Sequence, residues 1–181
     1  GTPVTDVREE NLSAPDGVSL IRPTVALVHD NSFFGFTSPI NGARSRLEYS
    51  PTFGTLHYQT LLADYRRYQF FNPVTVAFRA LHVGRYGSDS GSDRLNPLFL
   101  GYESLVRGYR SGSFQVSECP FGENCAVFDR LEGSRIGVVN LEVRVPVLGT
   151  KNYGLFNFPY IPTEFSAFVD GGVAWWQDDP Q

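Results

Sequence analysis

Apolar and polar residues alternate over several stretches of the chain, the pattern of β-strands whose two faces have different surroundings. The clearest case lies over 135–147, where valine and leucine residues alternate with Asn140, Glu142 and Arg144. The same period of two predicts further strands over 22–30, 43–50, 56–68, 74–85 and 165–175. No stretch has a clear helical periodicity, so the sequence predicts an all-β fold.

The predicted strands differ from those of ordinary soluble proteins in length and in the chemistry of their polar face. At roughly 8–13 residues they exceed the usual strand and match a tilted membrane strand. Their polar face carries arginine, aspartate, glutamate and tyrosine, whereas lysine occurs in the chain only as Lys151. Such groups pair with one another inside a barrel lumen while the opposite, apolar face meets lipid.

Aromatic residues, 14% of the chain, gather near the ends of the predicted strands. Aromatic girdles occupy this position at the two interfaces of a membrane barrel. The residues concerned are Phe33, Phe34, Phe36, Phe70, Phe71, Tyr86, Phe156, Phe158, Tyr160, Trp175 and Trp176. We therefore expect an antiparallel transmembrane β-barrel, partial or small, to which this chain contributes about six to eight strands. A soluble β-sandwich with an aromatic core is the alternative.

Length and charge limit the domain organisation and the class of partner. The chain has 181 residues, which suits one domain or a piece of a larger one. Residues 1–18 are polar and predict a linker, and residues 19–181 predict the partial barrel domain. The formal net charge of -4 gives little support to a nucleic-acid partner. No apolar run approaches the length of a membrane-spanning helix.

The segment 86–133 lacks the alternation and is rich in glycine and serine. A loop of this length inside a compact unit is usually functional. It contains Cys119 and Cys125 in a short stretch with proline and glycine, which suggests a local disulfide and an oxidising compartment. Free thiols and a metal site remain as alternatives, although no histidine or second cysteine pair stands nearby.

The same loop contains Val106-Arg107-Gly108-Tyr109, and Phe168-Val169-Asp170-Gly171-Gly172 follows in the last predicted strand. In each motif one charged residue stands among apolar or glycine neighbours. A buried charge is destabilising unless it is paired. We therefore expect Arg107 and Asp170 to meet in the interior of the β structure.

These motifs, in this order along the chain, also carry a resemblance to a known family. Between them stands Leu141-Glu142-Val143-Arg144-Val145-Pro146, and Asp64-Tyr65-Arg66-Arg67-Tyr68 precedes them. Over roughly residues 20–176 the chain resembles the carboxy-terminal barrel of the BamA/TamA-type bacterial surface antigen superfamily. The specific feature is the combination of these motifs in this order. The family barrel has more strands than this chain supplies.

The resemblance implies a specific arrangement of the long loop. In the family the loop folds back into the barrel lumen, and its arginine pairs with the aspartate of the strand motif. Carried over, Arg107 meets Asp170, Gly108 lets the backbone turn closely, and Tyr109 packs on the barrel wall. The other residues expected at this anchor or among the lumen charges are Gly172, Glu142, Arg144, Asp64 and Arg66.

The resemblance further implies a non-enzymatic role at the bacterial outer membrane, the insertion or translocation of proteins or lipids. The expected partners are membrane lipids, unfolded outer-membrane protein clients, and further strands or a partner chain that close the barrel. A passive barrel anchor for another domain and a soluble β-sandwich binding module are the alternatives. We expect no cofactor and no metal, and we interpret His29, His57 and His82, on three different predicted strands, as girdle or lumen residues.

Overall fold

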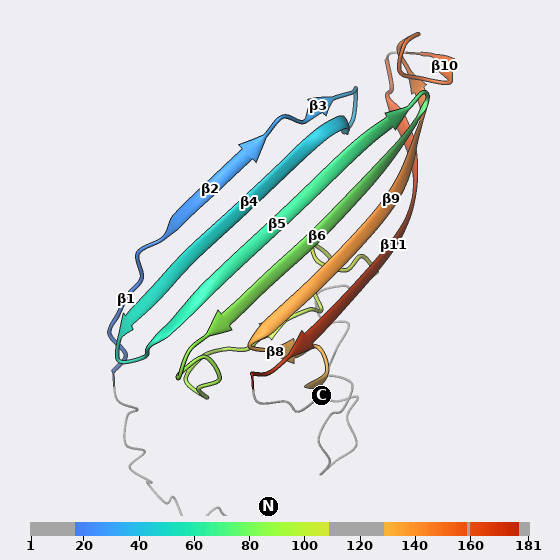
Figure 1. The fold of residues 1–181 in the computed structure, drawn as a ribbon. Helices are drawn as coiled ribbons and strands as arrows, with labels where there is room; N and C mark the ends of the chain where they lie inside the picture. Colours follow the sequence, from blue (N-terminus) through green and yellow to red (C-terminus); the bar gives the residue numbers. More distant parts are fainter. Residues whose placement is uncertain (1–16, 109–128, 159, 178–181) are drawn as a thin grey trace, which may run out of the picture.

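The computed structural model describes residues 17–108, 129–158 and 160–177 and is all-β, as predicted (Figure 1). Five long strands dominate a nine-stranded sheet, and short strands flank them. The long strands are β4 (Pro39–Gly54), β5 (Tyr58–Phe71), β6 (Val74–Tyr86), β9 (Arg135–Gly149) and β11 (Thr163–Trp175). The others are β1 (Leu20–Ile21), β2 (Val25–Asp30), β3 (Phe33–Phe34), β7 (Leu98–Phe99), β8 (Glu132–Gly133) and β10 (Phe156–Asn157).

The long strands run antiparallel in the order β4–β5–β6–β9–β11, and β2 pairs antiparallel with β4 at the edge. The expectation of a purely antiparallel sheet is wrong at one place, because the short β10 pairs with β9 in parallel. Over the described residues the sheet stays open, with β2 and β11 at its two edges (Figure 1). No helix in this part of the chain is long and apolar enough to cross a bilayer.

The strand predicted over 43–50 is considerably longer in the structure, since β4 covers 16 residues. Its flanks, which lie outside the predicted strand, contain glycine and proline, residues that usually interrupt strands. Gly42 instead lies within the strand with a φ of 99°, where an added Cβ would lie 2.3 Å from the Asn31 carbonyl oxygen. Pro51 lies opposite the break between β1 and β2, where the ladder on that side needs no N–H donor. Gly42 therefore marks a bend in β4, and Pro51 marks a gap in the neighbouring edge. The strand continues through both positions.

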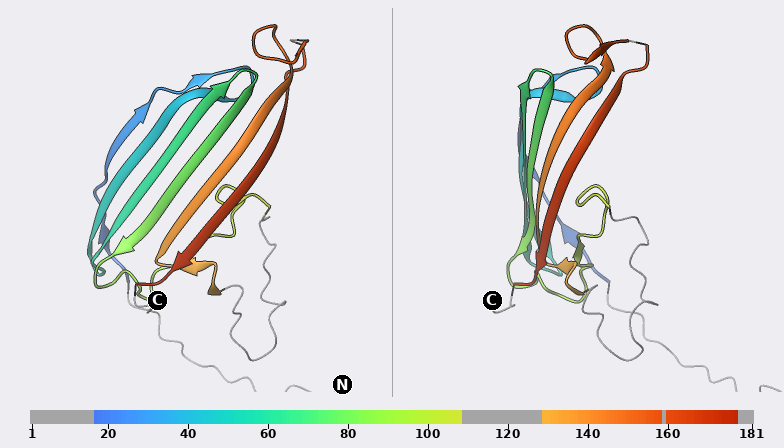
Figure 2. Two further views of the ribbon diagram at one scale, coloured as in Figure 1. Left: turned by 45° about the vertical axis from the view of Figure 1, so that its right-hand side comes forward. Right: turned by 90° about the vertical axis from the view of Figure 1, so that its right-hand side faces the viewer.

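The ladder register gives the sheet two chemically different faces, as the alternation predicts. We call the inner face the one against which residues 98–108 pack, and the outer face the opposite one. In the edge-on view of Figure 2 this part of the loop lies on one side of the sheet. One row across the inner face consists of Arg44, Arg66, Arg79, Asn140 and Asp170. The matching row on the outer face consists of Ser45, Tyr65, Ala80, Val139 and Gly171.

The buried core lies on the inner face, between the loop and one end of the sheet. Its most buried members are Leu81, Leu100, Ile136 and Val138, and Val106 packs against them. Leu100 is held in place because its amide donates a hydrogen bond of 2.8 Å to the Leu131 carbonyl, next to the pairing of β7 with β8. With the partly buried residues around it, this cluster has ten members among the described residues, and the long loop supplies five of them, Leu98, Leu100, Leu105, Val106 and Leu131. The loop is therefore part of the fold.

Candidate functional site

The candidate site is an ion network on the inner face that attaches the long loop to the sheet. The register places Arg44, Arg66 and Arg79 side by side on three neighbouring strands. Like charges directly opposite one another repel. Carboxylates in the adjacent rows compensate, because Asp64 lies one row to one side and Glu142 one row to the other.

Arg107 and Asp170 are in direct contact. The Arg107 side chain donates from Nε to Asp170 Oδ2 and from Nη2 to Asp170 Oδ1, each at 2.8 Å. The backbone amide of Arg107 donates a third hydrogen bond to Oδ2 at 2.9 Å. The Asp170 side chain is only 2% exposed. Both the side chain and the backbone of Arg107 thus bind the buried carboxylate of Asp170. This is the geometry of a strong charge-assisted pair.

A second carboxylate and an aromatic ring complete the surroundings of Arg107. Its Nη1 donates to Glu142 Oε2 at 2.5 Å, and Glu142 also accepts from Nε of Arg144 at 2.9 Å. The Arg107 guanidinium lies 3.9 Å from the centroid of the Phe168 ring, a cation–π contact. The hydrogen bonds that Arg107 donates to Asp170 raise its pKa above the ordinary arginine value. Arg107 is therefore a permanent cation in this site.

The loop has a second point of attachment at Ser104 and Leu105, shortly before Arg107 in the chain. Arg79 donates from Nη1 to the Ser104 carbonyl oxygen at 3.0 Å, and its Nε and Nη2 hold Asp64 at 3.2 and 3.1 Å. Asn140 donates from Nδ2 to the Leu105 carbonyl at 2.9 Å. Arg66 also donates to Asp64, from Nη2 to Oδ2 at 2.8 Å. Side chains of the sheet therefore satisfy the loop's own carbonyl groups, which otherwise would be left without donors near the core.

The second attachment gives a test of whether Arg79 orders the loop. Arg79→Met keeps the length of the side chain but removes its bonds to Asp64 and Ser104. Hydrogen bonds to charged groups contribute about 1.5–3 kcal/mol, so we expect amide exchange at Leu105 and Val106 to accelerate at least tenfold. The control is Arg46→Met, because Arg46 pairs with Glu48 and does not contact the loop. Equal exchange in both variants would show that Arg79 has no such role.

Glycine lets the loop approach the sheet closely at Gly172. An added Cβ there would lie 3.1 Å from Leu100 Cδ2 and 3.2 Å from Val106 Cγ2, both packed in the core. On the opposite face, an added Cβ at Gly171 would meet nothing within 4 Å. These adjacent glycines therefore differ in what a methyl group would encounter.

We expect Gly172→Ala to lower the free energy of unfolding by about 1–3 kcal/mol through overpacking. Gly171→Ala is the matched control, with the same chemical change one residue away and open space around it, and should stay within about 0.5 kcal/mol. Chemical denaturation of the two variants measures the difference. Equal loss in both would mean that the loop does not pack on Gly172.

The structure places most of the predicted site residues on the inner face. Beyond the pair Arg107 and Asp170, these are Gly172, Glu142, Arg144, Asp64 and Arg66. Gly108 has a φ of 102°, in the left-handed region that glycine tolerates best. Tyr109, Cys119 and Cys125 lie outside the described residues, as does most of the predicted linker 1–18.

Sequence reasoning missed Arg79, Asn140 and Phe168 as contributors to the site. Each lies on a polar or mixed face of its predicted strand, so the alternation places each on the correct side of the sheet. Asn140 stands two residues before Glu142, and Phe168 two residues before Asp170, so both share a face with a predicted site residue. Only the register between β5, β6 and β9 brings Arg79 next to Asp64 and the loop.

The chemistry of this site favours a structural role. Arg107, Arg144, Arg66 and Arg79 each pair with a carboxylate, which leaves the acids engaged. Within the described ranges no group of three or more histidine, cysteine, aspartate or glutamate side chains could hold a metal ion. His29 and His82 lie on the outer face, and His57 lies in the turn before β5. The arrangement is suited to holding a loop against a sheet.

Comparison with known proteins finds no relative of this chain. No protein-family model, no curated protein and no solved structure matches the chain.

Proposed function

We propose that the chain forms part of a transmembrane β-barrel of the bacterial outer membrane that inserts or translocates proteins or lipids. The observation that carries this proposal is the contrast between the two faces of one sheet. The outer face carries mostly apolar side chains, many of them exposed, whereas the inner face holds charges paired with one another and with the loop. This is the division that lipid on one side and a polar lumen on the other require.

The outer face presents large apolar side chains along its whole width. Leu27 on β2 is 73% exposed, Leu47 on β4 50%, and Val139 on β9 50%. Val169 on β11 is 74% exposed, and Phe165 64%. Soluble proteins rarely expose a continuous apolar patch of this extent, and such patches mark an interaction with another protein or a membrane. Strands of 13 to 16 residues are long enough to cross a bilayer when tilted.

In this proposal the anchored loop organises the lumen, as the family resemblance implies. Two attachments fix it, Arg107 on Asp170 and Arg79 on Ser104. An open sheet edge is not tolerated in lipid. The free edges of β2 and β11 therefore pair with further strands or a partner chain to close the barrel.

The two alternative functions, a passive barrel anchor and a soluble β-sandwich, predict different observations. A passive anchor would have the same sheet and loop but no effect on client proteins. A soluble β-sandwich needs a second sheet over the apolar face. Among the described residues the only other sheet is β7–β8, and its Leu98 and the adjacent Leu100 pack on the inner face, which favours the membrane sheet over the sandwich.

The test uses the full-length protein reconstituted in lipid vesicles. An unfolded outer-membrane β-barrel client is added from denaturant, and its folding rate is followed by the gel shift of the folded barrel. We expect folding several times faster than in empty vesicles. A protein that enters the vesicles without accelerating the client is a passive anchor. A protein that stays monomeric in buffer without detergent contradicts the membrane proposal altogether.

A further inference from the structure

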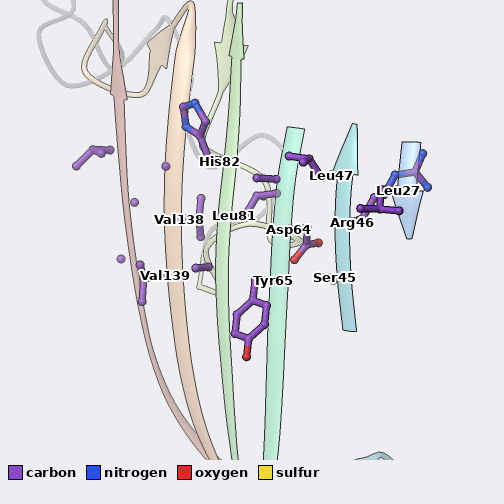
Figure 3. Close-up of a pocket in the computed structure, with 16 residues that line it drawn as sticks. Leu27, Ser45, Arg46, Leu47, Asp64, Tyr65, Leu81, His82, Val138 and Val139 are labelled. Carbon is purple, nitrogen blue, oxygen red and sulfur yellow. The ribbon is translucent and has the colours of Figure 1, made fainter. Parts of the chain in front are cut away.

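A groove of about 850 Å³ crosses the outer face of the sheet (Figure 3). One row of directly paired residues runs through it, Leu27, Leu47, Ala63, His82, Gly137 and Val173. Ala63 contributes only a methyl group to this row, and the side chains of Leu27, Leu47 and Val173 also line the groove. In Figure 3, Leu27 and Leu47 lie on one side of the groove and His82 on the other. The groove is therefore mostly apolar, and His82 and Tyr65 contribute polar atoms to its lining.

The row next to the groove, toward one end of the strands, brings Arg135 between Gly84 and Trp175. Aromatic rings surround this position. His82 stacks on Trp175 with ring centroids 5.8 Å apart, and its Nε2 lies 2.7 Å from the Tyr86 hydroxyl. The Arg135 guanidinium lies 4.4 Å from the centroid of the Tyr86 ring. A cluster of aromatic rings around one cation thus borders the apolar groove, one row closer to the end of the strands.

Arg135 differs from Arg66, Arg79, Arg107 and Arg144 because no carboxylate in the described part of the chain pairs with it. Among the residues that the structure describes, its side chain donates from Nη2 to Gln177 Oε1 at 3.3 Å. Its Nε is buried and has no acceptor within the described residues. A guanidinium on a lipid-facing surface is strongly destabilising unless an anion or water compensates it. An anion from outside the described sheet would compensate the charge of Arg135.

We propose that this outer-face site binds one membrane lipid with an anionic phosphate headgroup. The phosphate lies on the Arg135 guanidinium, flanked by Tyr86 and Trp175, and an acyl chain runs along the groove past His82 toward Ala63. Arginine and aromatic side chains at the level of the headgroups are the usual lipid contacts of a membrane protein. The inference rests on the proposed membrane location and adds a defined lipid site to it.

Trp175 lies in this site, and the chain has only 2 tryptophans, so its fluorescence reports on the bound lipid. The full-length protein with Trp176→Phe is reconstituted in vesicles containing a small fraction of brominated phosphatidylglycerol or brominated phosphatidylcholine, whose bromines quench tryptophan. We expect the anionic lipid to quench Trp175 at about fivefold lower content than the neutral lipid, as one basic residue near a membrane surface predicts. Arg135→Gln should abolish this preference, and Arg135→Lys should restore part of it.

The control is Arg67→Gln, which removes the same charge from the same face. Arg67 pairs with Phe78, six residues along β6 from Gly84, or about 20 Å from Arg135. It should leave the preference at Trp175 unchanged. High salt should weaken the preference in the unmodified protein, which tests the site even if Arg135→Gln does not fold.

The outcomes separate this site from the proposed function. Equal quenching by both lipids, or an unchanged preference in Arg135→Gln, overturns the lipid site while leaving the sheet in the membrane. Absence of quenching by either lipid contradicts the membrane location, and it therefore also contradicts the lipid site.

Discussion

Asp170→Ala is expected to lower the free energy of unfolding by about 3 kcal/mol, the lower end of the range for breaking a buried ion pair by removing one partner. The carboxylate of Asp170 is 2% exposed and accepts three hydrogen bonds from Arg107. Without it, the Arg107 amide, Nε and Nη2 lose their acceptor beside the core. The loss stays at the lower end because Arg107 is 31% exposed and keeps its bond to Glu142.

Denaturant unfolding of the reconstituted protein measures this effect, with Arg44→Ala as the matched control. Arg44 pairs with Asp30 at 3.6 Å, but both side chains are exposed, at 56% and 42%. Exposed pairs contribute about 0–1 kcal/mol, so the control should remain close to the unmodified protein. If Asp170→Ala unfolds at the same denaturant concentration as Arg44→Ala, the pair does not hold the loop.

The double variant Arg107→Ala with Asp170→Ala separates the pair from its surroundings. Removing both partners leaves no unpaired buried charge, so the double variant should be less destabilised than the sum of the single ones. A coupling of about 1–3 kcal/mol is expected for residues in direct contact. Additive losses would mean that the two residues act independently.

The faces of the sheet could be predicted from the sequence because strand side chains alternate with a period of two, whatever the partner strand is. Glu142, Arg144 and Asp170 therefore fall on the predicted side. The contact of Arg107 with Asp170 could be anticipated from the scarcity of other partners for two charges in apolar surroundings. Both inferences need only local sequence and general electrostatics.

The register and the strand ends could not be predicted in this way. The partner of Asp64 depends on which residue of β6 lies beside it, and alternation alone allows several registers. Arg79 was therefore missed, although its face was assigned correctly. The ends of β4 were missed because proline and glycine normally interrupt strands. Here Pro51 and Gly42 lie where the neighbouring edge is broken or bent, a property of other segments that local sequence does not contain.

Val169→Arg is expected to lower the free energy of unfolding in vesicles by about 2–4 kcal/mol, the effect of arginine on the lipid face of a barrel near the bilayer midplane. Val169 lies midway along β11, on the outer face, and is 74% exposed. On a surface in contact with water the same substitution would change stability by no more than about 0.5 kcal/mol. The substitution therefore tells whether lipid or water contacts the outer face.

Gln69→Arg provides the depth control, because Gln69 lies on the same face but pairs with Val76 near the end of β6. At the membrane interface an added arginine changes stability by only about 0–1 kcal/mol. A large loss at Val169 with a small one at Gln69 requires a medium that is apolar at the middle of the strands and polar at their ends. Only a bilayer has that profile along a strand, because a protein partner packed on the face would penalise both positions. Small losses at both would place the outer face in water and contradict the proposed function.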